Sequence, residues 1–393
     1  MREITIKIKK GSKPFYYCKE FYEREVSSGL KGCIPGDWVL IKEENQKSQL
    51  RLLAIANPIV SKGAPIRIIK ALSDSNEVNP EVVLKELCMT AIKKRKDFYH
   101  NQKGARLIFG DADNLPGVIC DEYVNLIVLQ INTAGMDRYR NFLRIFLEEY
   151  LNKKVYFLDN AEYRSAESLP SFSTDSLPEI EVEENGIKYK VPSRNIQKVG
   201  FYYDHRNNRL KMRDWLKQYK KECKNGVDLF SYVGAWGLNA LSEGIQKMTF
   251  VDQGDFHDAI IENLKINDLD GRGVFVREDI FQWLKKTNET FDLVISDPPA
   301  FSKNQKNKAK ALGGYERLHR GLVNIVKKGS LLAIGSCTHG ISLQELDLTV
   351  KKAFQSSSFT LTLLDIGIQG NDHPLSHLDE GSSYIKFLCY RVL

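Results

Sequence analysis

The sequence from residue 227 onward predicts an α/β fold built on a doubly wound parallel sheet. Apolar segments of strand length alternate there with helical segments, and the strands are expected to end near Phe230, Asp252, Val276, Ser296 and Gly335. The first strand leads into a loop with two glycines and then into helix-forming residues. This geometry lets a backbone approach a ligand at the carboxyl edge of the sheet.

The last two expected strands, 359–366 and 384–392, follow one another with only a loop between them. A loop that short cannot form a parallel crossover, so we expect an antiparallel hairpin at the sheet edge. An antiparallel final strand distinguishes this sheet from a plain dinucleotide-binding sheet. We therefore predict a Rossmann-like sheet with an antiparallel last strand.

The first 72 residues predict a small β domain. Residues 4–8 alternate like a half-buried strand, and Pro35-Gly36-Asp37 forms a turn before a strand at 38–41. Further short strands are expected at 50–56 and 66–69, and this close spacing suggests a compact β-barrel. Four lysines are either a solvated strand face or phosphate contacts: Lys7, Lys9, Lys10 and Lys13.

Residues 73–180 predict an α+β module. A helix is expected at 80–97, and its last turn is basic, which complements the helix dipole or faces a phosphate backbone. The other expected elements are strands at 106–109, 117–120, 125–131 and 155–158 and a helix at 138–151. The module carries no recognisable nucleophile or ligand cluster of its own.

The third expected domain spans 181–393, and a hairpin at 179–191 leads into it. Asn185-Gly186 is a strong short-range turn signal in the middle of that hairpin. The run 200–209, GFYYDHRNNR, is too polar and too aromatic to be a pure core element. A helix at 210–219 follows it and leads into the first strand of the sheet.

The bulk composition is that of an ordinary globular protein. The chain has 393 residues, which suffices for two or three domains. Its net charge of +7 fits an anionic partner such as RNA, but equally a merely soluble protein. No segment resembles a signal peptide or a membrane span, so we expect a cytoplasmic protein with no membrane partner. The seven cysteines lack C-x-x-C spacing, which argues against a disulfide framework and against a zinc site, so no metal is expected.

The glycine loop and three acids predict a site for a cofactor with an amino-acid tail, a ribose and an adenine. Asp228 would lie beside the cationic amino group, Asp252 would bind the ribose hydroxyls, and Asp279 would meet the adenine amine. Each acid alone is more often a cap or a surface charge, but three at successive strand ends favour the ligand. The loop residues expected to contact the cofactor are Phe230, Ser231, Tyr232, Gly234 and Gly237.

The segment Asp297-Pro298-Pro299 ends the fourth strand of the sheet. Two prolines make a rigid, extended exit that donates no hydrogen bonds, so its carbonyls can face a base on which Phe301 stacks. Asp297 would orient that ring or move protons, and it is also a candidate cofactor contact. The alternative is a simple strand-ending turn. The basic segment 303–310, which begins with Lys303, is a candidate phosphate clamp.

The fifth strand, 331–337, ends in a cysteine at the edge where ligands bind in this class of sheet. Most cysteines on apolar strands are inert, and we interpret the other six in that way. The thiolate of Cys337 can attack C6 of a pyrimidine, after which C5 takes a methyl group and a base removes the C5 proton. This requires a depressed thiol pKa. His339 and His373 are weaker candidates, because a lone histidine is more often structural.

Together these segments resemble the class I S-adenosylmethionine-dependent RNA methyltransferases, and more narrowly the ribosomal RNA large subunit methyltransferase I family. The resemblance covers nearly the whole chain, and its carriers are 106–123, 200–209, 228–237, 297–301, 336–338 and 372–374. It implies S-adenosyl-L-methionine as cofactor, with Arg206 among its contacts, and Cys337 as nucleophile. It also implies a PUA domain at 1–72, an RNA-binding central module and a C-terminal catalytic domain.

The activity that this resemblance implies is methylation of C5 of a cytosine in 23S ribosomal RNA. Ribosomal RNA is then the partner, and a homodimer is also considered. Thr338 departs from the serine that usually follows the nucleophile in the family. Two other functions stay open: methylation of a nitrogen on an RNA base, which needs no cysteine, and RNA binding without catalysis on the same scaffold.

Overall fold

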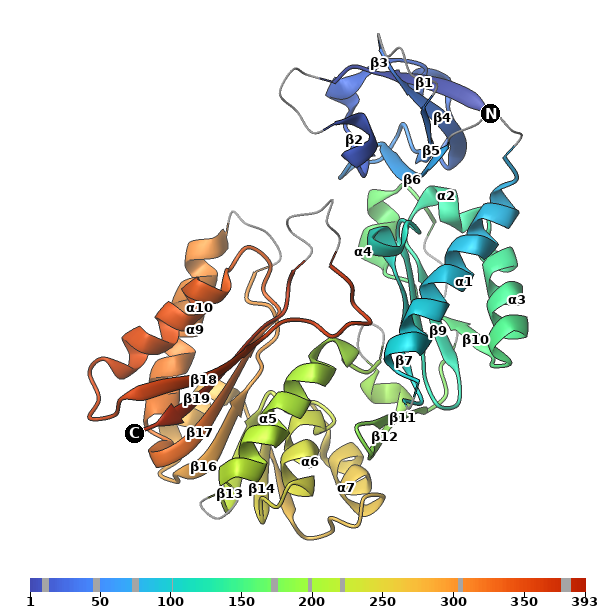
Figure 1. The fold of residues 1–393 in the computed structure, drawn as a ribbon. Coiled ribbons are helices and arrows are strands. Elements are labelled where there is room, and N and C mark those ends of the chain that lie inside the picture. The colour runs from blue at the N-terminus through green and yellow to red at the C-terminus, as the bar shows by residue number, and fades with distance from the viewer. Residues whose placement is uncertain are drawn as a thin grey trace. The chain divides into compact units, whose positions relative to one another are not determined.

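The computed structural model divides the chain into two compact units (Figure 1). Unit 1 comprises Met1–Leu177 and Asn371–Glu380, and unit 2 comprises Pro178–Gly370 and Gly381–Leu393. The described residues are 1–8, 14–44, 50–72, 78–100, 102–170, 176–196, 200–219, 223–302, 307–375 and 383–393. The division after Leu177 lies close to the boundary expected at 180. A short segment of the expected third domain clusters with unit 1 instead.

The N-terminal part of unit 1 is a six-stranded mixed sheet with the order β2-β6-β5-β4-β1-β3. Its strands are β1 (Arg2–Ile6), β2 (Glu20–Phe21), β3 (Val26–Ser28), β4 (Asp37–Glu43), β5 (Arg51–Ala56) and β6 (Ile66–Leu72). Strand β1 pairs in parallel with β4, and β4, β5 and β6 pair antiparallel. The four strands expected here are present, whereas three of the four lysines lie outside the described residues. The assignment as a PUA domain stays a prediction.

The rest of unit 1 is a four-stranded sheet packed between helices. The order is β10-β9-β8-β7, with β7 (Ala105–Phe109), β8 (Val118–Glu122), β9 (Ile127–Ile131) and β10 (Val155–Phe157). The helices are α1 (Pro80–Phe98), α2 (Ala134–Asp137), α3 (Arg140–Leu151) and α4 (Ala161–Ala166). Helix α1 begins where expected, because Asn79 caps it by accepting a hydrogen bond from the backbone N–H of Glu81 at 3.0 Å and Pro80 follows the cap.

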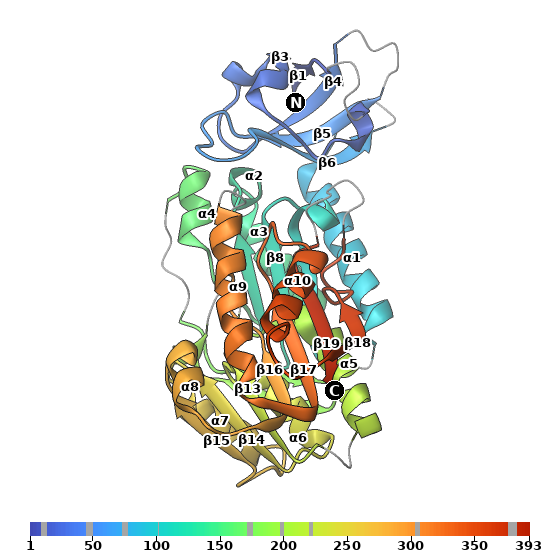
Figure 2. The same ribbon diagram turned by 90° about the vertical axis from the view of Figure 1, so that its left-hand side faces the viewer.

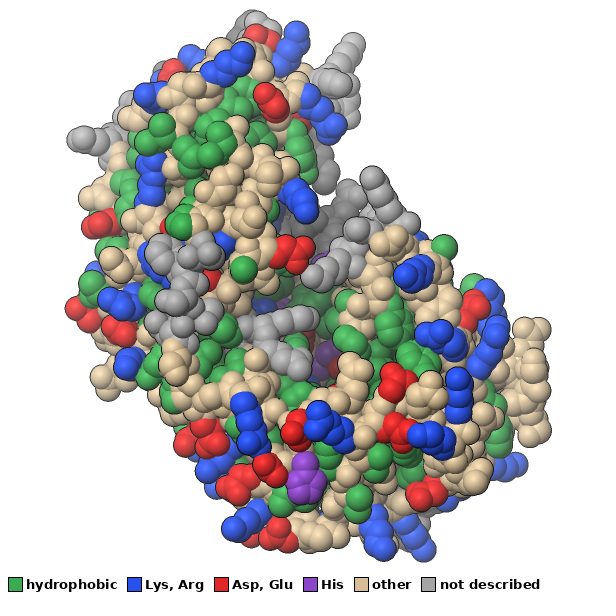
Figure 3. Space-filling model, turned by 180° about the vertical axis from the view of Figure 1, so that it is seen from behind, with side chains coloured by type: hydrophobic (Ala, Val, Ile, Leu, Met, Phe, Trp, Pro, Cys, Tyr) green, Lys and Arg blue, Asp and Glu red, His purple; other side chains and the backbone are tan. Residues whose placement is uncertain are grey.

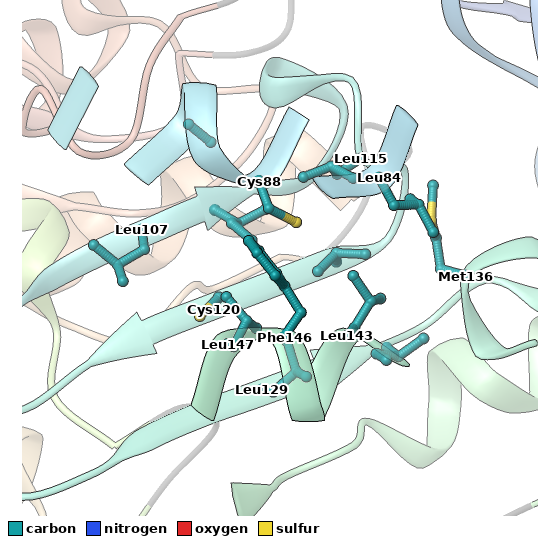
Figure 4. Packing of buried hydrophobic residues seen from close by; sticks show 14 of the residues in the cluster. Leu84, Cys88, Leu107, Leu115, Cys120, Leu129, Met136, Leu143, Phe146 and Leu147 are labelled. Atoms are coloured by element: carbon teal, nitrogen blue, oxygen red, sulfur yellow. The ribbon is translucent and has the colours of Figure 1, made fainter. Parts of the chain in front are cut away.

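The core of this module buries two cysteines (Figure 4). Cys88 comes from α1 and Cys120 from β8, and both lie among leucines and Phe146 of α3. Burial raises the pKa of the Cys88 thiol to about 12 and that of Cys120 well above its usual value. A thiol with so high a pKa is a poor nucleophile, which agrees with the interpretation of these cysteines as inert. All seven cysteines are free thiols.

Unit 2 begins with a hairpin of β11 (Ile180–Glu184) and β12 (Ile187–Val191). The two residues between its strands, Asn185 and Gly186, have φ of 54° and 80°. Positive φ at both positions is typical of the tight hairpin turn that the sequence predicts. Helix α5 (Arg206–Tyr219) follows and starts four residues before the helix expected at 210.

A seven-stranded sheet forms the centre of unit 2, with the order β15-β14-β13-β16-β17-β19-β18. Its strands are β13 (Asn225–Leu229), β14 (Lys247–Asp252), β15 (Gly273–Arg277), β16 (Phe291–Ser296), β17 (Val326–Ser336), β18 (Leu361–Gly367) and β19 (Lys386–Val392). The first five pair in parallel, and β19 runs antiparallel to both β17 and β18. The predicted Rossmann-like sheet with an antiparallel last strand is therefore confirmed.

Helices cover both faces of this sheet (Figures 1 and 2). Helices α9 (Lys308–Val323) and α10 (Leu343–Phe354) lie on one face, and α5 and α6 (Ala235–Ser242) lie on the other. Helices α7 (His257–Lys265) and α8 (Ile280–Lys286) complete the alternation of strands and helices. No helix in the described ranges is long and apolar enough to cross a membrane.

Helices α9 and α10 enclose a histidine that makes the stability of unit 2 depend on pH. His319 is fully buried, and its Nδ1 lies 3.1 Å from Oγ1 of Thr349. Burial lowers the pKa of His319 from 6.5 to about 3, so the ring stays neutral in the folded state. Below pH 6.5 the unfolded chain takes up a proton that the folded chain excludes, so stability is lost as the pH falls.

We expect the His319→Gln variant to lose less stability on acidification than the parent. Between pH 6.5 and pH 5, the parent should lose about 2 kcal/mol more of its free energy of unfolding, because only the parent has this histidine to protonate. Urea unfolding at the two pH values measures the difference. His257→Gln, which changes an exposed histidine, is the control. Equal acid sensitivity of the parent and His319→Gln would contradict the burial argument.

Candidate active site

The glycine loop after β13, residues 230–237, has an unusual backbone conformation with positive φ at three positions. Phe230 and Tyr232 have φ of 64° and 50°, and Gly234 has φ of 87°. Positive φ is costly for non-glycine residues and is common at ligand sites. At Gly237, in α6, a Cβ would overlap the ring of Phe250 in β14. The second glycine therefore lets the helix pack closely on the strand.

The buried side chain of Asp228 connects the end of β13 to the first turn of α6, across the glycine loop. Its Oδ2 accepts a hydrogen bond from the backbone N–H of Gly237 at 2.8 Å, and the side chain is fully buried. Burial raises the pKa of Asp228 well above its usual value, with the Gly237 hydrogen bond opposing the shift. Among the described residues, neither Oδ1 of Asp228 nor the hydroxyl of buried Ser231 has a hydrogen-bond partner. Buried polar atoms are rarely left unpaired, so both are open to a ligand.

The second and third acids lie at the ends of the neighbouring strands. Asp252 ends β14, and its two oxygens accept hydrogen bonds from the backbone N–H groups of Tyr232 at 3.0 Å and Gly254 at 2.8 Å. Asp279 lies just beyond β15, is exposed, and caps α8 by accepting from Gln282 N at 3.0 Å. The structure therefore places all three acids at the same edge of the sheet, and two of them touch the loop or its helix.

Asp297 follows β16 and is held by three elements. Its Oδ2 accepts a hydrogen bond from the indole N–H of Trp236 at 3.0 Å, and its Oδ1 lies 3.4 Å from Nε2 of His205. A Cβ at Gly335 in β17 would overlap the same Oδ1. Gly335 therefore provides the space that the carboxylate occupies. The side chain keeps 20% of its surface exposed, so it can still reach a ligand.

Cys337 follows β17, directly beside the segment that contains Asp297. Strands β16 and β17 are neighbours, and Ser296 pairs with Ile334. The Cys337 side chain is half-buried, and its Sγ lies 4.0 Å from the carbonyl oxygen of Pro298. The structure thus brings the cysteine and the Asp-Pro-Pro segment together, as predicted. Cys337 differs from the thiols of Cys88 and Cys120, which lie inside the hydrophobic core.

A hydroxyl chain ties these two segments to each other. The hydroxyl of Tyr315 in α9 donates to Oγ of Ser336 at 2.8 Å and lies 2.9 Å from Oγ1 of Thr338. Thr338 Oγ1 in turn accepts from the backbone N–H of Phe301 at 3.1 Å. Thr338, where the resemblance leads us to expect serine, still supplies the hydroxyl group that joins Tyr315 to Phe301. The residues on either side of Cys337 are therefore anchored.

The remaining predicted substrate contacts have different surroundings. Pro298 is buried and Pro299 is exposed, while Phe301 is half-buried and packs on Tyr315 with ring centroids 4.7 Å apart. Stacking of Phe301 on a base stays a prediction. Lys303 lies outside the described residues, and at the far end of the expected clamp Lys308 pairs with Glu345 at 2.7 Å.

Arg206 lies in a buried network that sequence reasoning did not find. Glu184, at the end of β11, is fully buried and binds Arg209 through both oxygens, at 2.6 and 2.8 Å, and Arg206 at 3.3 Å. Arg209 also donates to the carbonyl oxygen of Tyr202 at 2.8 Å. The network fixes the run 200–209, which carries His205. Sequence reasoning missed this network because Glu184 lies more than 20 positions before Arg206 and Arg209, so the three residues form no local motif.

The two weaker histidine candidates lie in different units. His339 is exposed in unit 2, where its ring stacks on Tyr384 with centroids 5.5 Å apart. His373 is buried in unit 1, with Nδ1 2.9 Å from Oδ1 of Asp372. Within the described ranges, no group of three His, Cys, Asp or Glu side chains is placed to hold a metal ion.

Comparisons with known proteins show what the chain is similar to as a whole. A family model described as conserved hypothetical protein 95 matches residues 206–343. A protein of Yersinia pestis bv. Antiqua named ribosomal RNA large subunit methyltransferase I is 29% identical over 301 residues, which cover 74% of this chain and 75% of that protein. The chain resembles the ribosomal RNA large subunit methyltransferase I family, as predicted.

Solved structures show the same fold. A protein from Streptococcus mutans described as a SAM-dependent methyltransferase has a TM-score of 0.74 at 18% identity, over 99% of this chain and 100% of that one. A structure described as a methyltransferase complexed with SAH has a TM-score of 0.76 at 19% identity, again over 99% and 100%. At these identities the likeness establishes the architecture, and the chemistry has to come from the residues themselves.

Proposed function

We propose that this protein is an S-adenosyl-L-methionine-dependent methyltransferase that acts on ribosomal RNA of the large subunit. The name of the relative in Yersinia pestis and the fold shared with a methyltransferase complexed with SAH support this activity. Within that activity, we propose that the methyl group goes to C5 of a cytosine in 23S RNA and that Cys337 forms a covalent bond to the base. The half-buried sulfur beside the Asp-Pro-Pro segment is the observation that carries the finer proposal.

The residues at the sheet edge fit the cofactor. The backbone of the loop from Phe230 to Gly237 would hold the amino-acid tail, and the open oxygen atoms of Asp228 and Ser231 would face its polar groups. Asp252 would bind the ribose, and exposed Asp279 would meet the adenine. The bound cofactor supplies an electrophilic methyl group. Arg206 would affect the cofactor site indirectly, because its contact with Glu184 helps to hold the segment 200–209 in place.

The protein groups then account for the chemistry at the base. The thiolate of Cys337 attacks C6 and forms an S–C6 bond, which makes C5 nucleophilic. After C5 has gained the methyl group, a base takes the C5 proton, and the electron pair released expels the sulfur. Asp297 is our candidate for orienting the ring or taking that proton, because Trp236 and His205 hold its carboxylate at this edge. We infer this role of Asp297 only from its position at this edge of the sheet.

The described residues on the face drawn in Figure 3 form no continuous basic patch that would mark a surface for RNA. On the face drawn in Figure 3, basic and acidic side chains are interspersed over the surface. The phosphate clamp at 303–310 stays a proposal. Within its described part, Lys308 forms an ion pair with Glu345. Nitrogen methylation remains the competing chemistry, since an Asp-Pro-Pro strand end can also receive an amine. RNA binding without catalysis would not explain why the buried oxygen atoms of Asp228 and Ser231 lack hydrogen-bond partners in the protein.

We expect Cys337→Ala to reduce methyl transfer to ribosomal RNA by at least about a thousandfold, because the covalent route loses its nucleophile. Transfer of labelled methyl groups to RNA from cells that lack this protein measures the effect. Cys389→Ala, at a buried cysteine of β19, serves as the matched control. Full activity of the Cys337→Ala variant would favour nitrogen methylation. If the parent protein binds RNA but does not bind S-adenosyl-L-methionine, RNA binding without catalysis is favoured instead.

We expect Gly335→Ala to lower kcat strongly while leaving the fold intact. The added methyl group would displace the carboxylate of Asp297, which is the end of a movable side chain and not backbone. A displacement of this kind costs about a hundredfold in rate. Gly313→Ala in α9, where a Cβ meets nothing within 4 Å, is the control and should keep activity. Unchanged kcat in Gly335→Ala would show that the position of Asp297 does not matter for the reaction.

A further inference from the structure

A buried lysine lies beside the proposed nucleophile. Lys386 is the first residue of β19, and it pairs across the sheet with Ser336, the residue before Cys337. Its Nζ donates hydrogen bonds to the carbonyl oxygen of Thr338 at 2.6 Å and to that of Tyr384 at 2.9 Å. The side chain is only 5% exposed. The ammonium group is therefore anchored to the backbone of the residue that follows the cysteine.

This ammonium group has no carboxylate partner within the described residues. Its two hydrogen bonds go to backbone carbonyls, and burial lowers the pKa of Lys386 to about 8. The Cys337 side chain opposes this shift in the pKa of Lys386, because a thiolate there would favour the protonated lysine. Burying an unpaired charge costs several kcal/mol, so a lysine at such a position needs a reason beyond packing. A thiolate at the neighbouring Cys337 would supply that reason.

The other titratable groups that face Cys337 do not compete for this role. Tyr202, before α5, and Tyr315 of α9 both have their pKa raised by burial, so both stay neutral. Asp297, after β16, accepts a hydrogen bond from Trp236 and lies beside His205. Among the described residues, Lys386 is therefore a cation that interacts with Cys337.

We propose that Lys386 is a positioning residue that keeps Cys337 in its thiolate form near neutral pH. The ammonium group stays protonated, and the thiol proton is released to solvent. The interaction forms within one unit, between the end of β17 and the start of β19. This inference deepens the proposed function, and it rests on that proposal for the use to which the thiolate is put.

The test is the pH dependence of alkylation by iodoacetamide, followed by mass spectrometry at each cysteine. In the parent, Cys337 should react at pH 7 at a larger fraction of its pH 10 rate than half-buried Cys18 does. In Lys386→Gln, alkylation of Cys337 at pH 7 should fall about tenfold, because an adjacent opposite charge moves a pKa by about one unit or more. At pH 10 the rates of the two proteins should converge, since the thiolate then forms without help.

Three further variants and sites separate charge from structure. Lys386→Arg keeps the positive charge and should restore most of the reactivity at pH 7. Lys217→Gln, at an exposed lysine of α5, should leave Cys337 unchanged. Alkylation of buried Cys223 reports unfolding of unit 2. If Lys386→Gln does not fold, the Lys386→Arg variant and the comparison of Cys337 with Cys18 in the parent still test the inference.

Coinciding pH profiles of Cys337 and Cys18 in the parent would overturn the inference. So would a Lys386→Gln variant that keeps the parent rate at pH 7, or one whose rate falls equally at pH 7 and pH 10, because the latter reflects access and not charge. The assay contains neither RNA nor cofactor. If alkylation gives the expected result but the Cys337→Ala variant is active, the covalent route to cytosine C5 is contradicted while the role of Lys386 stays intact.

Discussion

The site depends on the carboxyl ends of two neighbouring parallel strands lying at one edge of the sheet. Because β16 and β17 are paired in parallel up to Ser296 and Ile334, the segments that follow them emerge side by side, and each carries one group for the proposed chemistry. Gly335 makes room for the carboxylate of Asp297, and the carbonyl of Pro298 approaches the sulfur of Cys337. The backbone pairing of the sheet thus brings together the segments that carry Asp297 and Cys337.

Buried polar contacts around this edge keep the reacting groups in place. Glu184 binds two buried arginines and so fixes the run that carries His205. Tyr315 connects the two loops through hydroxyl groups, and Lys386 reaches across from the antiparallel strand. Buried ion pairs are expensive, and they rarely add stability in proportion to their number. Their value here is that they fix loops which the hydrophobic core alone would leave free to shift.

The sequence predicted the sheet and its edge because those features leave local signals. The glycine loop, the acids after successive strands and the cysteine after the fifth strand all depend on short segments with a known period. Glu184, Trp236 and Lys386 left no such signal, because each acts on a residue far away in the chain. Their partners follow from the register of β17 with β19 and from the packing of α5 and α6, which a single sequence does not reveal. The helix at 206 was also missed at its start, because its first turn is polar.

The central claim is that the sulfur of Cys337 bonds to C6 of the target base. The most direct measurement uses ribosomal RNA transcribed with 5-fluorocytidine, incubated with the protein and S-adenosyl-L-methionine. Fluorine at C5 prevents removal of a proton there, so the S–C6 bond should persist, and mass spectrometry should find the RNA adduct on the peptide that contains Cys337. RNA that is methylated without any adduct, or an adduct on another cysteine, would contradict the claim.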